Sequence, residues 1–409
     1  MWWKDRAKRL RTRRPISEKT IIFTESVVLS LLCLSFFLFR TEPGQAAMAH
    51  AGKAAAALGL EKMLPQKQEN ATPPEAKSYI KWVDFTVTCE AMNQAFRYDV
   101  DTCQADVHLN WVDLLAYLGA RYGGDFSRYK AADMTQVAEK LKSGETTMEA
   151  LTKDMKYYRY YREAYGAVLD GMVGQFEAQI PASEAPGAYL PSGVTGGAPG
   201  DPETIWVTKY GLKAFSPIAK GFPYSDFDDF GVARSYGFRR QHLGHDLMGQ
   251  VGTPVIAVES GYVEAIGWNQ YGGWRLGIRS FDKKRYYYYA HLRKDYPYQS
   301  NLKEGSYVQA GDVIGYLGRT GYSRTENTNN IDEPHLHFGL QLIFDESQKE
   351  GNNEIWVSCY ELVKFLSMNR SQAVKVEGTK EWTRVYGTKD PQVPDTPPAE
   401  PSKAPESNP

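Results

Sequence analysis

The sequence predicts an α+β protein with three parts: an N-terminal transmembrane helix, a small all-α domain and a C-terminal antiparallel β domain. An apolar run of 19 residues follows a basic N-terminus, as in a membrane-spanning segment. Residues 79–177 repeat apolar side chains at helical spacing, whereas residues 205–389 alternate apolar and polar residues between glycines. With 409 residues, 42% hydrophobic residues and a net charge of -1, the chain is globular, long enough for two domains and unlike a nucleic-acid-binding protein.

The N-terminal part combines positive charge with an apolar run. Residues 1–20, expected in the cytoplasm, contain eight Lys or Arg residues and two acidic residues. The run Ile21–Phe39 can cross a hydrocarbon layer of roughly 30 Å as a helix. Glu25 interrupts this run and Ala47-Met48-Ala49 resembles a signal cleavage site, so the run is either a retained anchor or a cleaved signal. Both alternatives export the rest of the chain.

Export changes the interpretation of the cysteines, because disulfides persist outside the cytoplasm. Cys89 and Cys103 are candidates for a disulfide, and the alternative is two free buried thiols. Cys33 lies in the apolar run and Cys359 has no neighbouring cysteine. No CxxC pair occurs, so the sequence does not indicate a zinc site made of thiolates.

The remaining boundaries follow from composition. Residues 40–78 are rich in Ala, Gln, Lys and Pro and are expected to form a stalk or linker. The helical domain is expected over residues 79–177 and a Pro/Gly linker over residues 178–204. Residues 390–409, which include seven prolines, are expected to be a disordered tail. The helical domain also has a group of tyrosines that is expected to pack in the core or at an interface, with sugar or partner binding as the alternative: Tyr157, Tyr158, Tyr160, Tyr161 and Tyr165.

The β domain carries a cluster of histidines. Five of the seven histidines of the chain fall within one stretch: His242, His245, His291, His335 and His337. His335 and His337 are at positions i and i+2 of a predicted strand, so their side chains project to the same face, and His291 ends a second predicted strand. A turn through Gly244 brings His242 and Asp246 together. Two neutral imidazoles and one carboxylate suit zinc, and three protein ligands leave a fourth position for water, as in catalytic sites. His50 and His108 lie far upstream and are expected to be ordinary residues.

Several motifs surround these histidines in a fixed order. They are Phe230-Gly231 with Arg234, HLGHD at 242–246, GTPVIAVESGYVEAIG at 252–267, YAHL at 289–292, GSYVQAGDVIGYLGRTG at 305–321 and PHLHF at 334–338. In this order, from about Tyr224 to Leu342, the chain resembles the lysostaphin/LytM-type zinc endopeptidases, which cut peptidoglycan peptides. The resemblance implies that residues 205–389 form a zinc peptidase domain with its core at residues 224–342. It provides no interpretation of the helical domain.

The resemblance also implies a role for each matching residue. The expected zinc ligands are His242, Asp246 and His337. The expected catalytic pair that does not bind the metal is His291 and His335. These imidazoles would take the proton of the attacking water and support the charge that grows on the carbonyl oxygen. Tyr236 is a candidate for oxyanion support, with packing as its alternative.

Two features depart from the family pattern. His245 occupies a position that is usually aliphatic, and it is expected to face away from the metal. Residues Tyr322–Glu333 are longer than the turn that the family usually has before PHLHF. They are expected to form a polar loop at the rim of the groove, where they would affect which peptide fits.

These observations predict an exported, membrane-anchored zinc metalloendopeptidase that hydrolyses the peptide stems or cross-links of peptidoglycan. Its expected partners are a peptidoglycan peptide and, through residues 21–39, the cytoplasmic membrane, with the peptidase domain outside the cell membrane. Secretion after signal cleavage is the alternative location. The rival function is a non-enzymatic wall-binding or scaffolding component of an envelope-spanning assembly for secretion, conjugation or sporulation, with partners bound by the helical domain. Because every motif position is filled, the sequence favours the enzyme.

Overall fold

The computed structural model describes residues 79–184, 204–235, 239–349, 351 and 353–394. The described residues belong to one compact unit. The expected membrane segment Ile21–Phe39, the basic residues before it and the stalk after it lie outside the described residues. Within the described ranges, no helix combines the length and the apolar character that crossing a membrane requires.

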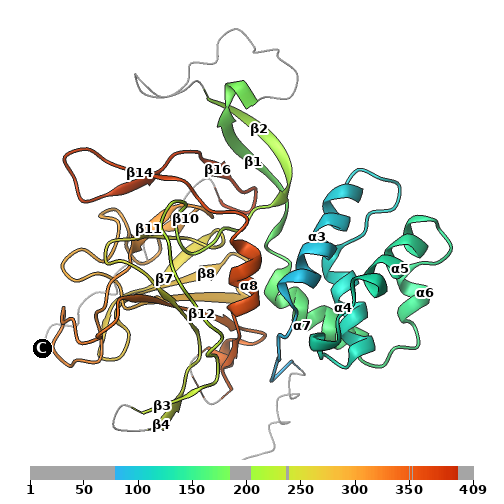
Figure 1. Cartoon of the computed structure of the whole chain (residues 1–409), viewed down its shortest axis with the longest axis horizontal. Helices are drawn as coiled ribbons and strands as arrows, with labels where there is room; N and C mark the ends of the chain where they lie inside the picture. The colour runs from blue at the N-terminus through green and yellow to red at the C-terminus, as the bar shows by residue number, and fades with distance from the viewer. Residues whose placement is uncertain (1–78, 185–203, 236–238, 350, 352, 395–409) are drawn as a thin grey trace, which may run out of the picture. The chain divides into compact units, whose positions relative to one another are not determined.

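Helices make up the first part of this unit and are drawn in blue to green in Figure 1. They are α3 (Cys89–Thr102), α4 (Trp111–Tyr122), α5 (Ala131–Lys142), α6 (Met148–Thr152) and α7 (Tyr158–Leu169), with a 3-10 turn η2 (Phe126–Arg128). In α4 the Asn110 side chain accepts hydrogen bonds from the backbone N–H groups of Val112 and Asp113, and Gly123 ends the helix with a φ of 66°.

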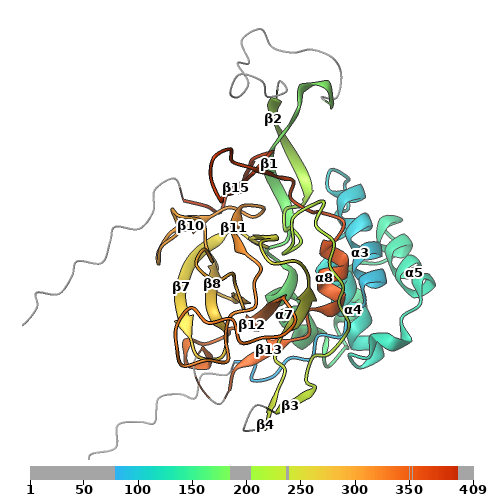
Figure 2. The same ribbon diagram turned by 60° about the vertical axis from the view of Figure 1, so that its left-hand side comes forward.

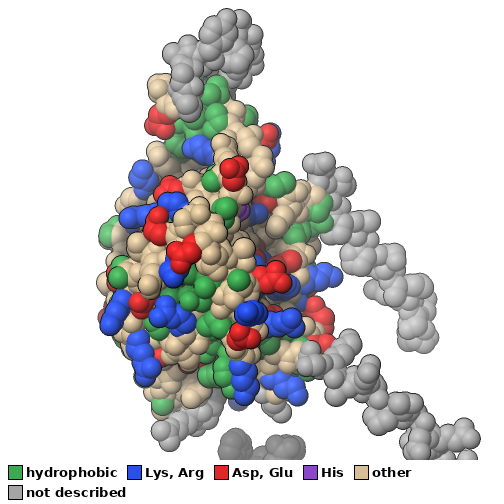
Figure 3. Space-filling model, turned by 90° about the vertical axis from the view of Figure 1, so that its right-hand side faces the viewer, with side chains coloured by type: hydrophobic (Ala, Val, Ile, Leu, Met, Phe, Trp, Pro, Cys, Tyr) green, Lys and Arg blue, Asp and Glu red, His purple; other side chains and the backbone are tan. Residues whose placement is uncertain are grey.

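On the face shown in Figure 3, Lys and Arg side chains are interspersed with Asp and Glu. That face therefore lacks the continuous positive patch of a nucleic-acid-binding surface.

The tyrosines of α7 contribute to packing, as expected. Tyr165 is fully buried and meets the ring of Phe85 edge-on, with ring centroids 5.7 Å apart. Three further tyrosines are partly buried against the same core: Tyr158, Tyr160 and Tyr161. Tyr157, which precedes the helix, is exposed. The amphipathic pattern therefore reflects one buried face of the helix.

The second part of the unit is built around one antiparallel sheet. Its strands are β5 (His245–Met248), β7 (Gly261–Asn269), β8 (Gly273–Ser280), β9 (Arg285–Ala290), β10 (Tyr307–Val308), β12 (His335–Leu342) and β13 (Ile355–Val357). The strand order is β10-β7-β8-β9-β12-β13, and β5 also pairs with β12. Figure 2 shows β7 and β8 side by side near the middle of the view. The sheet is antiparallel, as the alternation of apolar and polar residues predicts.

Short elements complete this part. The paired short strands are β3 (Ala233–Ser235) with β4 (Arg239–Gln241), β6 (Pro254–Ile256) with β11 (Val313–Tyr316), and β14 (Ala373–Lys375) with β15 (Trp382–Arg384). The remaining helical elements are α8 (Tyr360–Leu366) and two 3-10 turns, η3 (Ala182–Glu184) and η4 (Glu346–Gln348). Figure 1 shows the hairpin β3–β4 standing out from the sheet.

A long hairpin replaces part of the expected linker. Strand β1 (Val173–Pro181) pairs with β2 (Thr204–Leu212) along its whole length, and β16 (Thr388–Lys389) pairs with the other edge of β1. Residues 173–177 are therefore not helical, and residues 178–181 are not linker. Phe176, Ala178 and Ile180 are buried in alternation with more exposed neighbours, which is the period of a strand. The Pro/Gly-rich residues 185–203 lie outside the described residues.

One hydrophobic core runs through the helices and the sheet. Phe365 of α8 stacks on Trp111 of α4 with ring centroids 5.6 Å apart, and it meets Phe96 of α3 edge-on at 5.8 Å. Because α8 follows the strands of the sheet in sequence, this contact joins segments that lie far apart along the chain. The helical and β regions therefore bury apolar surface against each other and share one core.

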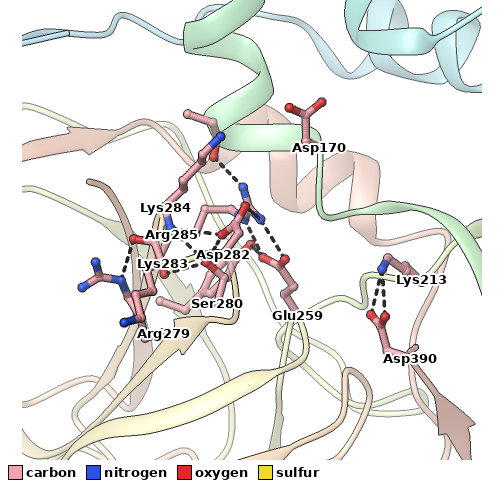
Figure 4. Close-up of polar contacts among 12 residues, drawn as sticks. Asp170, Lys213, Glu259, Arg279, Ser280, Asp282, Lys283, Lys284, Arg285 and Asp390 are labelled. Carbon is pink, nitrogen blue, oxygen red and sulfur yellow. Dashed lines mark hydrogen bonds and ion pairs between the residues drawn. The ribbon is translucent and has the colours of Figure 1, made fainter. Parts of the chain in front are cut away.

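A buried arginine adds polar contacts between the two regions. Arg285 of β9 donates to both carboxylate oxygens of Glu259 at 2.7 and 3.0 Å and to the Ala167 carbonyl oxygen of α7 at 3.0 Å. Figure 4 shows its guanidinium between Glu259 and Asp282, which accepts a further hydrogen bond at 2.8 Å. Burial alone would lower the pKa of Arg285, but Glu259 outweighs this effect and the pKa is raised. The arginine therefore stays charged at a position where an unpaired charge would be costly.

A second buried ion pair fixes the C-terminal end of the described chain. Lys213 Nζ lies 2.9 Å from Asp390 Oδ2, and both side chains are buried (Figure 4). The expected disordered tail, residues 390–409, therefore starts too early, because Asp390 belongs to the folded unit. Residues 395–409 lie outside the described residues.

The expected disulfide is wrong. Cys89, Cys103 and Cys359 are free thiols. Cys89 begins α3 and Cys103 directly follows its last residue, so the two cysteines lie at opposite ends of one helix. At 1.5 Å per residue the helix separates them by about 21 Å, whereas a disulfide needs Cα atoms within about 7 Å. The alternative of free thiols holds for this pair, and both thiols are partly buried.

Candidate metal centre

Three neighbouring strands bring the expected site residues together. β12 lies between β5 and β9, and its residue His337 pairs with Asp246 of β5 on one side and with Ala290 of β9 on the other. His291 directly follows Ala290 at the end of β9. His335 precedes His337 by two residues, so both imidazoles project from the same face of the sheet. Nε2 of His335 lies 3.8 Å from Oδ1 of Asp246.

His242, Asp246 and His337 converge on one point. Asp246 Oδ1 lies 3.1 Å from His242 Nε2 and 2.9 Å from His337 Nδ1, and these two nitrogens are 2.9 Å apart. Atoms that bind one tetrahedral zinc ion at about 2.0–2.1 Å lie roughly 3.3 Å from one another. Two imidazole nitrogens and one carboxylate oxygen in a triangle of this size therefore fit a single zinc ion.

The orientation of His242 is fixed from its other side. Its Nδ1 lies 3.0 Å from Oδ2 of Asp229 and 3.3 Å from the Asp229 carbonyl oxygen. These acceptors assign the ring proton to Nδ1, so Nε2 is left unprotonated toward the cluster. Arg234 donates to Asp229 and lies 2.9 Å from Oδ2 of Asp246. The arginine thus occupies one oxygen of Asp246 and leaves Oδ1 for a metal.

Gly244 allows the turn between His242 and Asp246 to approach β12. A Cβ atom at this position would lie 2.5 Å from Cε1 and Nε2 of His337 and 2.9 Å from the Phe338 carbonyl oxygen. Because the last atom belongs to the backbone, a side chain at position 244 would displace either the turn or the His337 ring. A glycine is therefore required here by close approach.

His291 and His335 lie beside this cluster. Nδ1 of His291 donates to the Thr320 carbonyl oxygen at 2.9 Å, and Nδ1 of His335 donates to the Glu333 carbonyl oxygen at 2.8 Å. In these tautomers Nε2 of each ring is a proton acceptor. The ring centroid of His291 is 4.8 Å from that of His335 and 5.8 Å from that of His337. His291 also has a φ of 61°, in the left-handed region that non-glycine residues seldom adopt outside constrained sites.

Burial controls the charge of these groups. Burial lowers the pKa of His291 well below its ordinary value of 6.5, and the neighbouring imidazoles lower it further. Burial also lowers the pKa of His337, despite the Asp246 carboxylate beside it. Burial would raise the pKa of Asp246, but hydrogen bonds from His242 and His337 outweigh it and hold that pKa far below its usual value. At neutral pH His291 and His337 are therefore neutral and Asp246 is ionised, as metal binding requires of its ligands.

His245 is directed away from the cluster, as expected. Its Nε2 lies 2.8 Å from Oδ2 of Asp226, and its ring meets Tyr360 edge-on at 5.5 Å. Because successive residues of a strand point to opposite faces, the side chains of His245 and Asp246 lie on opposite sides of β5. His245 therefore contributes to packing and to an ion pair and not to the metal site.

The loop that departs from the family pattern lies next to His291. The ring of Tyr322, its first residue, is 5.7 Å from the His291 ring. The loop is held by internal contacts, since the Asn330 side chain donates to the Tyr322 carbonyl oxygen at 2.8 Å. The expected rim loop Tyr322–Glu333 is thus adjacent to the site. Tyr236, the candidate for oxyanion support, lies outside the described residues.

Two residues that orient the site were not expected from the sequence. Asp229 accepts from His242, and the backbone of Thr320 accepts from His291. Asp229 directly precedes the Phe230-Gly231 motif, and Thr320 lies within the motif at 305–321. Their positions beside or within these motifs are the sequence features that could have pointed to Asp229 and Thr320. Spacing alone, however, does not show which residue near a motif faces a histidine.

Comparison with known proteins shows that the segment containing the site is similar to one peptidase family. Residues 240–350 match the profile of peptidase family M23. The L-Ala–D-Glu endopeptidase of Bacillus subtilis (strain 168) is 40% identical over 124 residues, which are 30% of this chain and 36% of that protein. The peptidoglycan DD-endopeptidase ShyC of Vibrio cholerae is 33% identical over 131 residues, which are 31% of this chain and 26% of that protein. The chain thus spans about a third or less of the length of these two relatives.

One solved structure of similar sequence is a catalytic domain. The catalytic domain of the antimicrobial peptidase lysostaphin from Staphylococcus simulans is 31% identical, with a TM-score of 0.26. The match covers 34% of this chain and 92% of that domain. The segment that matches the family profile contains His242, Asp246, His291, His335 and His337. Residues 240–350 are therefore similar in sequence to peptidase family M23, and the candidate metal centre lies within this segment.

Proposed function

We propose that this protein is a zinc metalloendopeptidase that hydrolyses peptide bonds in peptidoglycan. The observation that carries the proposal is the convergence of His242 Nε2, Asp246 Oδ1 and His337 Nδ1, which lie 2.9 to 3.1 Å from one another. The relatives support the reaction class, since both are named as endopeptidases and one is named for peptidoglycan. A three-ligand site with a fourth position for water is the arrangement of catalytic zinc, whereas structural zinc has four protein ligands.

The residues of the site divide into two groups by what they contact. His242, Asp246 and His337 would hold the metal. A bound zinc ion would lower the pKa of a coordinated water to about 7 and would polarise the scissile carbonyl. Asp229 and Arg234 orient His242 and Asp246 and so fix the direction of the ligand atoms.

His291 and His335 would move the proton. Backbone carbonyls fix the proton of each ring on Nδ1, so each Nε2 can accept the proton of the attacking water. Burial lowers the pKa of His291, which keeps this imidazole neutral and able to act as a base at neutral pH. Once protonated, either ring can stabilise the charge on the carbonyl oxygen and can return the proton to the leaving amine.

The test is digestion of purified peptidoglycan by the full-length, zinc-loaded protein. Mass spectrometry of the products should show new amine and carboxyl ends in equal number, which identify the bond that is cut. The two relatives are named for different bonds, so the new ends also assign the specificity. A digest by zinc-loaded protein that contains no new ends would overturn the proposed function.

We further propose that Ile21–Phe39 anchors the protein in the cytoplasmic membrane with the peptidase region outside. The support is the apolar run itself and the basic residues before it. The intact protein should then stay in the membrane fraction after a high-salt wash, because salt screens surface charge but does not extract a spanning helix. Recovery of soluble protein that begins near His50 would instead establish a cleaved signal.

A further inference from the structure

We propose that Asn327 is a positioning residue for the reaction. It ties the loop Tyr322–Glu333 to β8 and to the segment after β9, and this connection fixes the ring of His291 for proton transfer. The inference rests on the proposed function, in which His291 moves the proton. It begins from the side chain of Asn327, which is partly buried within the loop that departs from the family pattern.

The Asn327 side chain binds two other segments of the β region. Its Oδ1 accepts hydrogen bonds from the indole N–H of Trp274 and from the backbone N–H of Asp295, both at 2.9 Å. Its Nδ2 donates to Oδ1 of Asp295 at 2.6 Å. Because an indole N–H and a backbone N–H can only donate, the amide must direct its oxygen toward them. Trp274 belongs to β8 and Asp295 follows β9, so Asn327 fixes the loop to both.

The same loop contacts the segment that holds His291. The Thr328 carbonyl oxygen, next to Asn327 in the chain, accepts a hydrogen bond from the backbone N–H of Gly321 at 3.2 Å. Gly321 follows Thr320, whose carbonyl oxygen accepts the Nδ1 proton of His291 at 2.9 Å. A Cβ atom at Gly321 would lie 3.1 Å from Nδ1 of His291, so the backbone here lies directly against the ring.

Trp274 closes a ring of contacts around His291. Its backbone N–H donates to Oγ1 of Thr320 at 3.1 Å, and its carbonyl oxygen accepts from the backbone N–H of Leu292 at 3.0 Å. Oγ1 of Thr320, which is fully buried, donates to the Leu292 carbonyl oxygen at 2.6 Å. The residue that Asn327 binds through its indole is therefore bound through its backbone to both neighbours of the His291 ring. A displacement of Trp274 or of the loop would move the acceptor that orients His291.

Strained backbone marks the two segments that Asn327 joins. Four non-glycine residues on these segments have left-handed backbone: His291, Asp295, Tyr322 and Asn327, with φ of 61°, 63°, 47° and 58°. Residues other than glycine keep this conformation where the surrounding structure enforces it, and such positions cluster at functional sites. The hydrogen bonds of Asn327 connect the two segments, so they help to enforce the backbone of His291.

The test measures kcat and KM of the zinc-loaded, full-length protein on soluble peptidoglycan fragments, from the appearance of new amine ends. Asn327→Gly permits the left-handed backbone but removes all three hydrogen bonds of the side chain. We expect kcat to fall by roughly tenfold to a hundredfold, because a small displacement of a catalytic group has an effect of this size. KM should change by less than about twofold, since the contacts of Asn327 act on His291 and not on the bound peptide. Bound zinc should stay at the wild-type level.

An exchange of the two bonded side chains tests the same contact with its hydrogen bonds restored. Asn327→Asp alone places two carboxylates against each other and should also lower kcat. Addition of Asp295→Asn returns a donor opposite the new carboxylate, and kcat of the double variant should recover to within about threefold of wild type. Glu326→Gly is the matched control, because Glu326 is exposed and directly precedes Asn327. It should leave kcat and KM unchanged.

Several results would overturn the proposal. They are wild-type kcat in Asn327→Gly, a rise in KM without a fall in kcat, no recovery in the exchanged variant, or an equal loss of kcat in Glu326→Gly. Loss of bound zinc in Asn327→Gly would also overturn it, because the effect would then act through the metal. Each of these results leaves the proposed function intact when wild-type protein cleaves peptidoglycan. Failure of the zinc-loaded wild-type protein to cleave would refute the proposed function itself.

Discussion

The ring of His337 packs against the backbone of Gly244, so closely that a Cβ atom at Gly244 would lie 2.5 Å from two ring atoms. Gly244 lies in the turn that connects His242 to Asp246, whereas His337 belongs to β12. This contact fixes the distance between the two sequence segments that supply the ligand atoms. The geometry of the site therefore depends on one position without a side chain.

Gly244→Ala should weaken zinc binding and destabilise the protein. The added methyl group must displace the His337 ring or the turn, and overpacking of this kind costs typically about 1–3 kcal/mol. Zinc affinity and urea unfolding measure the two effects. Gly211→Ala is the control, because a Cβ atom there has no neighbour within 4 Å, and it should leave zinc affinity unchanged. Equal zinc affinity in Gly244→Ala and wild type would contradict the inferred packing.

The free energy of unfolding of the zinc-free protein should decrease as the pH falls below about 6.5. Burial lowers the pKa of His291 below 6.5, so the unfolded chain takes up a proton at this residue before the folded protein does. The contribution of neutral His291 is complete above pH 6.5 and decreases as the pH falls from 6.5 toward the lowered pKa. His337, whose pKa is also lowered, adds to the same trend.

His291→Asn isolates this contribution, because asparagine tolerates the left-handed backbone of His291. The loss in free energy of unfolding between about pH 7.5 and about pH 5.5, measured by urea in the presence of a chelator, should be smaller in the variant than in wild type. An identical loss in the two proteins would show that His291 is not the titrating group.

Arg285→Met should cost about 3–5 kcal/mol of stability, because it leaves the buried Glu259 carboxylate without its cation. The exposed pair Lys142–Glu139 provides a comparison. Lys142→Met should change stability by less than about 1 kcal/mol, since solvent screens an exposed pair. Denaturant unfolding of wild type, Arg285→Met and Lys142→Met gives the free energy of unfolding of each protein. A similar loss of free energy in the two variants would show that Arg285 does not hold the helical and β regions together.

The β region should not fold alone. Phe365 of α8 packs on Trp111 and Phe96, which belong to the helical region, and Arg285 loses its Ala167 acceptor when that region is removed. A fragment of residues 204–394 would expose this apolar surface to water. Circular dichroism with thermal melting should show no cooperative transition for the fragment. A soluble fragment that melts like the full chain would contradict a shared core.

The local geometry of the site could be predicted from the sequence because it depends on short-range periodicity. The spacing of His335 and His337 within one strand predicts that they share a face, and the glycine between His242 and Asp246 predicts the turn. The side on which His245 lies follows from the same alternation along β5. The assignment of ligand and non-ligand histidines came from the family resemblance and not from spacing.

Features that depend on long-range contacts could not be predicted in this way. The hydrogen bond from Arg285 to the Ala167 carbonyl joins residues 118 positions apart, and no local pattern records it. The disulfide prediction used the spacing of Cys89 and Cys103 but did not recognise that a single helix separates them. The strand Val173–Pro181 was assigned partly to a helix and partly to a linker, because its partner β2 begins only after the Pro/Gly-rich residues.

The most direct test of the metal site is the zinc content of single-residue variants, measured by elemental analysis of purified full-length protein. His242→Ala, Asp246→Ala and His337→Ala should each lose most of the bound zinc, since each removes one of three converging ligand atoms. His291→Asn and His335→Ala should keep zinc at the wild-type level and yet lose cleavage of peptidoglycan. Wild-type zinc content in His337→Ala, or loss of zinc in His291→Asn, would contradict the division between ligands and proton-transfer residues.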